Sequence, residues 1–489
     1  MNTNHDNFKN HTLLPTRVLQ FGEGNFLRAF VDAMIQEMNH KAGFNSSVIV
    51  VQPIETGLVD VLNSQNGKYN LYLRGIKNGK PESSCELIES IHSGINPYYD
   101  FDAFLKTAEI PEMRFIISNT TEAGICLTDQ DNPDDCPPKS FPAKLTVWLF
   151  HRYQTFNGDM RKGMLLLPCE LIEKNGTRLE KYILEFAERF NYPESFINWI
   201  KEANIFCNTL VDRIVPGYPK ERIEEVTAEL GYIDRLVVEA EPFHLWVIES
   251  QKDISNEFPA LKAGLNVLFV KDLAPYRTRK VRILNGAHTT LVPVAYLCGF
   301  DTVRESLEDS LLNQFLQKAI HEEIIPTLDL PEAELKQFAD EVNNRFMNPY
   351  IKHYLISIAL NSFSKFETRV LPSILEFVKR NGVVPEKLTF SLAALIVFYK
   401  GKRDEEIIPL KDDKDILEFL QTGWTTYNGD TDNLFNFVFA VLGLNSVWKT
   451  DLNQVTGLTK AVTRHLINIE ENGMKAALKR VTCKQAYVE

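Results

Sequence analysis

The chain has 489 residues, of which 44% are hydrophobic and 24% are charged, as is typical of folded globular proteins. A single hydrophobic core usually stops growing near ~250–300 residues, so we expect two domains. The 53 lysines and arginines against 65 aspartates and glutamates give a formal net charge of −12. This excess of negative charge disfavours nucleic acid as a partner, because it repels phosphates.

The sequence also disfavours a membrane protein and a secreted one. Apolar runs such as 435–444 are far shorter than the ~20 residues that a membrane-spanning helix needs. Residues 1–12 are polar and lack the apolar core of a signal peptide, and seven cysteines, an odd number, are typical of reduced thiols. We therefore expect a cytoplasmic enzyme without membrane or nucleic-acid partners, present as a monomer or a small homo-oligomer.

The first 60 residues carry the pattern of a βαβ unit. A short apolar strand at 17–21 runs into Gly22 and Gly24, an amphipathic helix follows at 27–38, and a second apolar strand occupies 47–51. Strand, glycine turn, helix and strand in this order are typical of parallel strands joined by a crossover helix.

Strand and helix patterns continue to alternate along the first half of the chain. Asn78-Gly79 favours a hairpin turn, because both turn positions tolerate positive φ. The alternation predicts an α/β domain with a mostly parallel sheet. Further strands are predicted at 69–74, 84–90, 114–118, 163–168, 204–207 and 235–239, and helices at 144–152 and 177–189.

After about residue 265 the patterns become helical. The predicted helices are at 275–296, 305–323, 332–345, 350–360, 371–380 and 452–480. We therefore expect a second domain that is mainly α-helical, with the boundary within 265–275. The predicted domains are 1–268 and 269–489.

The glycine turn after the first strand is a candidate site for a dinucleotide. Gly22 and Gly24 stand where a backbone must approach a pyrophosphate, directly before a helix. The third glycine of the usual G-x-G-x-x-G pattern is absent, because residue 27 is leucine. A tight turn without a ligand is the alternative.

Other candidates for dinucleotide binding follow the strands that neighbour this turn. Gln52 stands where an acidic residue usually binds the adenosine ribose, and it leaves the choice between NAD and NADP open. Asn119 and Thr120 follow the strand at 114–118, at the expected carboxyl edge of the sheet, and a surface turn is the alternative. The full set of candidates is Phe21, Gly22, Gly24, Asn25, Phe26, Gln52, Asn119 and Thr120.

Residues 275–288 carry four polar side chains of different kinds on one predicted helix, and Pro275 suits its first turn. If successive residues are ~100° apart, then Arg277, His288 and Asn285 project about 60°, 80° and 140° from Lys280. They then share one face. Such a grouping indicates a site, and a solvated basic face is the alternative.

This set of side chains fits the reduction of a ketone without a metal. Lys280 can donate a proton to the developing alkoxide, and three neighbouring arginines would lower the pKa of its amine. Asn285 can donate a hydrogen bond to the same oxygen, and His288 can orient a substrate hydroxyl. Arg277 can pair with a substrate carboxylate, because its planar fork matches one.

Four blocks of sequence, taken in order, resemble the mannitol dehydrogenase family of polyol-specific long-chain dehydrogenases. They are FGEGNFLRAF at 21–30, VDRIVP at 211–216, EPF at 241–243 and K-x4-N-x2-H at 280–288. The resemblance implies a Rossmann-type N-terminal domain, a mainly helical C-terminal domain, NAD as cofactor and no metal.

The resemblance also implies roles for single residues. Lys280 would be the general acid/base, with Asn285 and His288 beside it and Asp212 near the substrate. The chain departs from the mannitol-type pattern at two positions. Leu171 stands where a second oxyanion-hole asparagine is usual, and Arg277 stands where a glutamate is usual.

A cation in place of an acid at the substrate face favours an anionic sugar acid over a neutral polyol. Lys365 and Arg369 are further candidates for binding its carboxylate. We expect an NAD-dependent reductase that converts a keto sugar acid reversibly into the hydroxy acid. The alternatives are another sugar-acid reductase, a polyol dehydrogenase or a dinucleotide-binding sensor without turnover.

Overall fold

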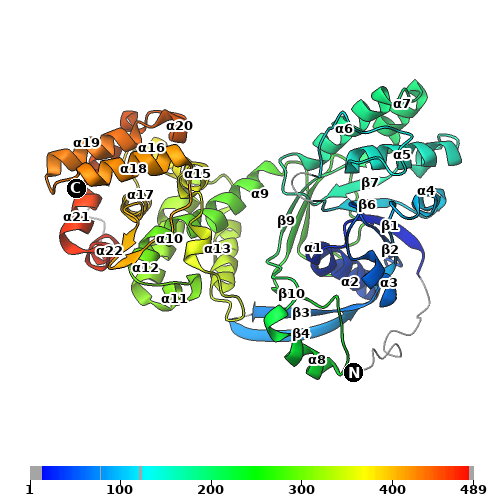
Figure 1. Cartoon of the computed structure of the whole chain (residues 1–489), viewed down its shortest axis with the longest axis horizontal. Helices are drawn as coiled ribbons and strands as arrows, with labels where there is room; N and C mark the ends of the chain where they lie inside the picture. Colours follow the sequence, from blue (N-terminus) through cyan, green and yellow to red (C-terminus); the bar gives the residue numbers. More distant parts are fainter. Residues whose placement is uncertain (1–13, 78, 121–123, 484–489) are drawn as a thin grey trace. The chain divides into compact units, whose positions relative to one another are not determined.

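The computed structural model describes residues 14–77, 79–120 and 124–483 (Figure 1). The chain divides into two compact units, the first formed by Met1–Gly75 with Glu82–Leu273 and the second by Ile76–Pro81 with Ala274–Glu489. The boundary expected at 268/269 falls inside strand β12 (Val267–Val270). Asn78, in the predicted hairpin turn, lies outside the described residues.

The first unit is built on a six-stranded sheet in which every neighbouring pair of strands is parallel (Figure 1). The strands stand in the order β5-β2-β1-β6-β7-β8. This confirms the predicted α/β fold with a mostly parallel sheet. The strands are β1 (Thr16–Phe21), β2 (Ser47–Val51), β5 (Ile91–Ile95), β6 (Phe115–Ser118), β7 (Leu165–Pro168) and β8 (Ile205–Phe206).

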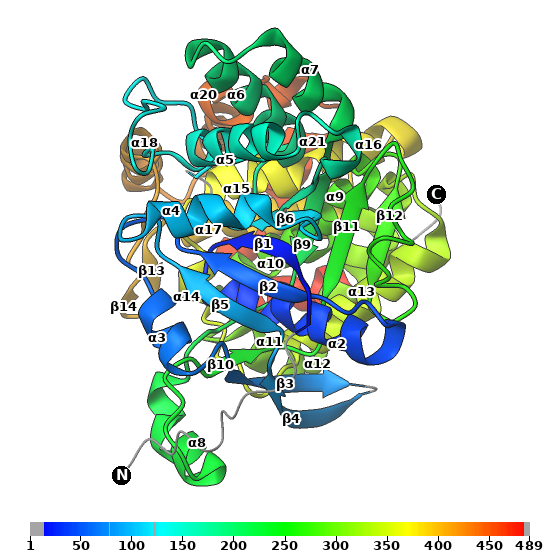
Figure 2. The same ribbon diagram turned by 90° about the vertical axis from the view of Figure 1, so that its right-hand side faces the viewer.

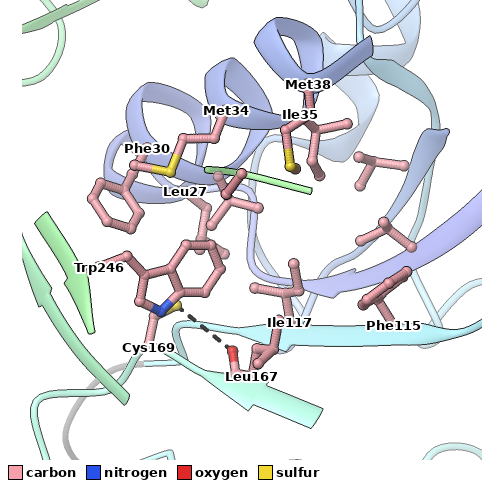
Figure 3. Packing of buried hydrophobic residues seen from close by; sticks show 14 of the residues in the cluster. Leu27, Phe30, Met34, Ile35, Met38, Phe115, Ile117, Leu167, Cys169 and Trp246 are labelled. Carbon is pink, nitrogen blue, oxygen red and sulfur yellow. Dashed lines mark hydrogen bonds between the residues drawn. The ribbon is translucent and has the colours of Figure 1, made fainter. Parts of the chain in front are cut away.

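Successive side chains of each strand point to opposite faces of the sheet. Both sets are apolar here, and helices cover both faces. Val50 and Ile117 belong to one buried cluster, and Val51 and Ile116 to the other. Figure 3 shows the first cluster, where the helix after β1 packs over Ile117 and Trp246. Figure 2 shows α2 (Ala33–Ala42) on one side of the sheet and α5 (Phe141–Thr155), α6 (Asn175–Arg189) and α7 (Glu194–Ala203) on the other.

Two three-stranded sheets belong mainly to the first unit. One has the order β12-β11-β9, and the other has the order β10-β3-β4. The sequence patterns do not indicate β5, β9, β11 or β12, which have four or five residues each. The remaining elements are β3 (Tyr69–Lys77), β4 (Lys80–Ile88), β9 (Asn208–Asp212), β10 (Val238–Ala240), β11 (Leu245–Glu249), α3 (Val59–Ser64), α4 (Phe101–Lys106) and α8 (Ile223–Leu230).

The second unit is mainly helical, as predicted, and two helices form its centre. Nearly every side chain of α10 (Gly286–Leu297) and α17 (Glu386–Phe398) is buried, and the Ser391 hydroxyl of α17 donates to the Thr290 carbonyl of α10 at 2.8 Å. Around them lie α9 (Ala274–Arg279), η6 (Lys280–Asn285), α11 (Val303–Glu308), α12 (Ser310–Lys318), η7 (Ala319–Ile324), α13 (Glu332–Phe346), α14 (Leu355–Ile358), α15 (Ser362–Arg369), α16 (Leu371–Asn381), α18 (Lys414–Thr426), α19 (Thr431–Leu442), α20 (Asn445–Trp448), α21 (Leu458–Asn472) and α22 (Met474–Cys483).

Some predicted helices differ from the observed ones where a capping residue intervenes. The helix predicted at 305–323 is divided at Asp309, whose carboxylate accepts from the amides of Leu311 and Leu312 and so begins α12. The helix predicted at 452–480 is divided at Gly473, where φ is 77°. Only α14 forms within 350–360, and α17 to α19 were not predicted.

None of the helices in the described part of the chain has the length and apolar character needed to cross a membrane.

Candidate active site

The glycine turn lies at the point where the strand order of the six-stranded sheet changes direction. From β1 the sheet continues through β2 on one side and through β6 on the other. The Gly22 amide donates to the Val51 carbonyl of β2, and the Asn119 amide donates to the Phe21 carbonyl of β1. In open α/β sheets, ligands bind at the carboxyl ends of the strands beside such a switch point.

Only glycine fits at position 22. Its φ is +118°, and a Cβ there would lie 3.1 Å from the Asn119 carbonyl oxygen and 3.1 Å from the Leu27 side chain. Gly24 has an ordinary φ of −67°, and a Cβ there would meet no atom within 4 Å. The turn is therefore closely packed on its inner side and open at Gly24, which fits the approach of a dinucleotide pyrophosphate to the backbone.

A buried arginine holds the turn from within. Arg28 is 2% exposed and donates to the Glu23 carbonyl at 3.1 Å, to the Asn25 side-chain oxygen at 2.7 Å and to the Leu236 carbonyl. It begins η2 (Arg28–Asp32), a π-helical turn between α1 (Asn25–Leu27) and α2. The guanidinium of Arg28 therefore donates to protein oxygens, and one of these is the side-chain oxygen of the candidate residue Asn25.

The loop after β6 is anchored by a carboxylate that the sequence analysis missed. Glu170 is 2% exposed and accepts from the Ser118 hydroxyl at 3.1 Å and from both the amide and the hydroxyl of Thr120 at 2.9 Å. Burial raises the pKa of Glu170, and the bonds from Thr120 and Ser118 act in the opposite direction. The side-chain nitrogen of Asn119 donates to the Cys169 carbonyl at 2.9 Å. Asn119 and Thr120 are thus fixed at the carboxyl edge.

Two of the residues predicted to bind the dinucleotide have side chains that contact other parts of the protein. The Phe21 ring is fully buried and lies 4.8 Å from the Phe141 ring, so only its backbone reaches the edge. Gln52 is 2% exposed, its nitrogen donates to the carbonyls of Ile54 and Glu55 at 2.9 Å, and its oxygen accepts from the Val59 amide at 3.3 Å. Gln52 therefore shapes the loop after β2.

Two of the sequence blocks that suggested the family are joined in the first unit. The Arg213 guanidinium donates to the Glu241 carbonyl at 2.8 Å, and the Glu241 carboxylate accepts from the Ile214 amide at 2.6 Å. Burial lowers the pKa of Arg213 to about 10, although the nearby Glu241 charge acts in the opposite direction. This linkage fixes the chain directly after Asp212, which ends β9 and is 6% exposed.

In the second unit, the predicted lysine helix is interrupted by a π-helical segment. Residues Lys280–Asn285 form η6, between the α-helices α9 and α10. The projection at ~100° per residue is therefore wrong across this segment, because a π-helix winds more slowly. Lys280 begins η6 and Asn285 ends it. These two side chains and that of Arg277 are partly buried, whereas His288 is 8% exposed. Such π-helical turns are frequent at functional sites.

The arginines beside Lys280 have structural partners. Arg279 is 4% exposed, forms an ion pair with Glu334 of α13 and lies 4.4 Å from the centre of the Phe338 ring. Arg282 donates to the Thr368 carbonyl, at the end of α15, at 2.7 Å. The negative charge of Glu334 offsets part of the positive field that was predicted to act on Lys280.

Close packing brings the end of α15 against η6 and α10. A Cβ added at Gly286 would lie 3.2 Å from the Arg369 carbonyl oxygen, so the small residue lets the two helices approach. The bond from Arg282 to Thr368 fixes the same contact. The structure therefore brings Lys365 and Arg369 into the surroundings of His288, as their electrostatic effect on this imidazole shows.

His288 lies in a cationic and aromatic environment. Its ring stacks on Phe346 at 4.1 Å and meets the His353 ring edge-on at 4.8 Å. Its Nε2 is buried without a hydrogen-bond partner in the described part of the chain. Burial lowers the pKa of His288 well below its ordinary value, and the charges of His353, Arg345, Arg369 and Lys365 lower it further.

The cations beside His288 are only partly compensated. Lys365 donates to the Ile358 carbonyl at 2.8 Å, and burial followed by the Arg369 charge lowers its pKa, while Asp412 acts in the opposite direction. Burial also lowers the pKa of Arg369, and no carboxylate among the described residues forms an ion pair with it. A half-buried guanidinium without a counter-charge is suited to binding an anion.

Arg345 and His353 belong to this cluster and were not anticipated. Arg345 lies in the last turn of α13, and His353 lies in the segment between α13 and α14. Neither residue stands in a repeating pattern, so only the packing around His288 reveals them. No group of three or more metal-binding side chains is found among residues 14–77, 79–120 and 124–483.

Comparison with known proteins identifies the class. The family model for the mannitol dehydrogenase Rossmann domain matches residues 16–262, and the model for the mannitol dehydrogenase C-terminal domain matches residues 272–470. The chain belongs to the mannitol dehydrogenase family, which confirms the resemblance seen in the sequence.

The chain is similar to particular members of this family. It is 49% identical over 466 residues to altronate oxidoreductases of Escherichia coli, including that of strain K12, with 95% of this chain and 96% of each relative covered. Among solved structures, a Pseudomonas fluorescens mannitol 2-dehydrogenase in a ternary complex with NAD and D-mannitol is 23% identical, with a TM-score of 0.66 and coverage of 97% and 96%. A substrate-free D-sorbitol dehydrogenase is 22% identical, with a TM-score of 0.78 and coverage of 95% of both chains. These two structures confirm the fold.

Proposed function

We propose that this protein is a tagaturonate reductase, an enzyme also called altronate oxidoreductase. It reduces D-tagaturonate reversibly to D-altronate with NADH and without a metal, in cytoplasmic hexuronate catabolism. The observation that carries the proposal is the 49% identity, over 95% of this chain, to proteins of that name. The cations beside His288, of which Arg369 has no ion-pair partner among the described residues, support an anionic substrate.

NAD, when bound, supplies the hydride chemistry. The residues proposed to hold it are those at the carboxyl edge of the six-stranded sheet. The open backbone at Gly24 and the close-packed Gly22 would accept the pyrophosphate. Asn119 and Thr120 would contribute through the loop that Glu170 anchors.

Lys280 is proposed as the general acid in the reducing direction and the general base in the oxidising direction. Its ammonium gives a proton to the oxygen of the substrate ketone, and the amine takes it back from the altronate hydroxyl. Asn285 donates its amide hydrogen to the same oxygen and so stabilises negative charge there. The π-helical segment places these two residues at its two ends.

His288 is proposed to act as a neutral hydrogen-bonding group. Its lowered pKa keeps the imidazole uncharged at neutral pH, so it can accept from a substrate hydroxyl without adding a further positive charge to the cations around it. The buried Nε2 without a partner is the atom available for this bond. Asp212 is proposed to contact another substrate hydroxyl.

Arg369 is the strongest candidate for binding the substrate carboxylate, with Lys365 and Arg277 as further candidates. Arg369 is half-buried and lacks an ion-pair partner among the described residues, so an incoming carboxylate would restore its charge balance. Lys365 adds a second positive charge, which also acts on His288.

Steady-state rates with NADH and D-tagaturonate, D-fructuronate and D-fructose test the proposal. We expect tagaturonate to have the highest kcat/KM. A higher value with fructuronate would indicate fructuronate reductase, and a higher value with fructose would indicate a mannitol-type polyol dehydrogenase. Binding of NADH without turnover of any of the three would favour the dinucleotide-binding sensor.

A further inference from the structure

Glu23 stands between the two glycines of the turn, and its side chain reaches the loop that follows β2. Its Oε1 accepts from the Leu58 amide at 3.3 Å. A Cβ added at Gly57 would overlap this oxygen and would lie 2.6 Å from the Gln52 amide carbon. The carboxylate of Glu23 and the amide of Gln52 therefore lie side by side, in a space that the missing side chain of Gly57 leaves open.

This place has a defined role in Rossmann-type domains. The adenosine ribose of a dinucleotide lies between the glycine turn and the end of the second strand, and an acid at the end of that strand normally binds its hydroxyls. In this chain Gln52 occupies the position of that acid. Its side-chain nitrogen donates to Ile54 and Glu55 of the loop after β2, and its oxygen accepts from Val59, the first residue of α3. The usual ribose ligand is therefore missing from β2.

We propose that Glu23 supplies the missing acid from the glycine turn, so that its carboxylate accepts hydrogen bonds from the adenosine ribose of NAD and repels the 2′-phosphate of NADP. An ionised carboxylate has about four acceptor sites. The amides of Leu58 and of Glu23 itself occupy only part of them. This inference rests on the dinucleotide part of the proposed function and does not depend on the sugar acid.

The surroundings of Glu23 fit this role. The side chain is partly buried, and burial raises the pKa of its carboxyl group while the two backbone amides and Arg28 oppose the change. A partly desolvated carboxylate repels a second anion more strongly than an exposed one, because less water screens the two charges. The guanidinium of Arg28 donates to carbonyl and side-chain amide oxygens of the protein, so it does not offer a partner for a 2′-phosphate.

The test measures dinucleotide binding by the full-length protein in the absence of any sugar. Fluorescence titration gives the Kd of NADH and of NADPH for the wild type and for Glu23→Gln, which keeps the shape and removes the charge. We expect the ratio of the NADPH Kd to the NADH Kd to fall by about tenfold or more in Glu23→Gln. Glu23→Asp keeps the charge and is expected to keep most of the discrimination.

The matched control is Glu55→Gln, which removes an exposed acid from the same loop and is expected to leave the ratio unchanged. An unchanged ratio in Glu23→Gln would overturn the inference, as would a fall in Glu55→Gln alone or an equal fall in Glu23→Gln and Glu23→Asp. Because only binding is measured, these outcomes are separate from a failure to turn over tagaturonate. Circular dichroism of each variant shows whether the fold is retained.

Discussion

The glycine turn and the lysine helix use their residues in opposite ways. At the turn, the side chains of Phe21, Arg28 and Gln52 are committed to the protein, and the backbone is left open for a ligand. At the lysine helix, the backbone is packed against α15, and charged side chains remain without full compensation. The comparison teaches that the proposed dinucleotide edge depends mainly on backbone shape, with few side chains such as Glu23 added, whereas the proposed proton transfer and carboxylate binding depend on charged side chains.

The largest expected effect concerns the lysine helix and tests whether the side chain of Lys280 transfers the proton. Lys280→Met should lower kcat/KM for tagaturonate about a thousandfold, because a general acid contributes about 10²–10⁴ to the rate. The Kd of NADH should stay within about threefold of wild type, since only transition-state stabilisation is lost. Stopped-flow and steady-state NADH absorbance measure the first quantity, and fluorescence titration measures the second. An exposed lysine on the first unit, Lys262, provides the control variant Lys262→Met.

The next effect separates recognition of an acid from recognition of a polyol. Arg369→Met should lower kcat/KM for tagaturonate about 10- to 100-fold, the range expected when a charge-assisted hydrogen bond is lost. The reduction of fructose, which has no carboxylate and is expected to be slower, should change little. Arg304→Met on α11 serves as a matched control for the loss of a surface guanidinium. Equal losses with both substrates would mean that Arg369 supports the fold of the site and does not bind the carboxylate.

A pair of glycine variants tests whether the backbone of the glycine turn binds the dinucleotide. Gly22→Ala should weaken NADH binding about tenfold and lower the thermal midpoint, because alanine at φ +118° is strained by about 1–3 kcal/mol and meets the Asn119 carbonyl. Gly24→Ala has an ordinary φ and open space, so it should weaken NADH binding without loss of stability. Thermal unfolding and NADH titration distinguish the two. Unchanged NADH affinity in Gly24→Ala would place the pyrophosphate elsewhere.

The smallest effect concerns pH. The pKa of His288 is lowered in the folded state, so below the ordinary histidine value of about 6.5 the unfolded chain binds a proton that the folded chain excludes. This contribution destabilises the protein as pH falls through that range, by at most about 1.4 kcal/mol per pH unit, and is absent above it. His288→Phe should therefore reduce the fall in thermal midpoint between pH 7.5 and 5.5. His353, whose pKa burial also lowers, provides the comparison variant His353→Phe.

Sequence patterns predicted those features that depend on neighbours along the chain. The strand–turn–helix–strand order, the glycines of the turn and the change to helical texture after residue 265 all follow from local periodicity and backbone preference. The blocks at 21–30, 211–216, 241–243 and 280–288 were sufficient to identify the family. The strands β9 and β12 were missed, although β6 and β7, which are equally short, were predicted from their continuous apolar runs.

The candidate site was predicted only in part, because its side chains find partners far away in the sequence. Arg279 pairs with Glu334 across 55 positions, which offsets part of the positive field that was expected to act on Lys280. The π-helical segment changes the directions of Lys280 and Asn285, which a regular helix would misplace. The contact of His353 with His288 depends on how the segment between α13 and α14 lies against α10.

The sequence by itself determined the class of the protein, the order of its elements and the kinds of side chain available for chemistry. Only the tertiary structure decided which of those side chains are already used. In the fold, the Gln52 side chain donates to the loop that follows it, and the Glu23 carboxylate accepts from the same segment. Arg369 has no ion pair among the described residues. The physical reason is that backbone conformation follows mainly from adjacent residues, whereas the charge balance and hydrogen bonding of a side chain depend on whatever the fold brings next to it.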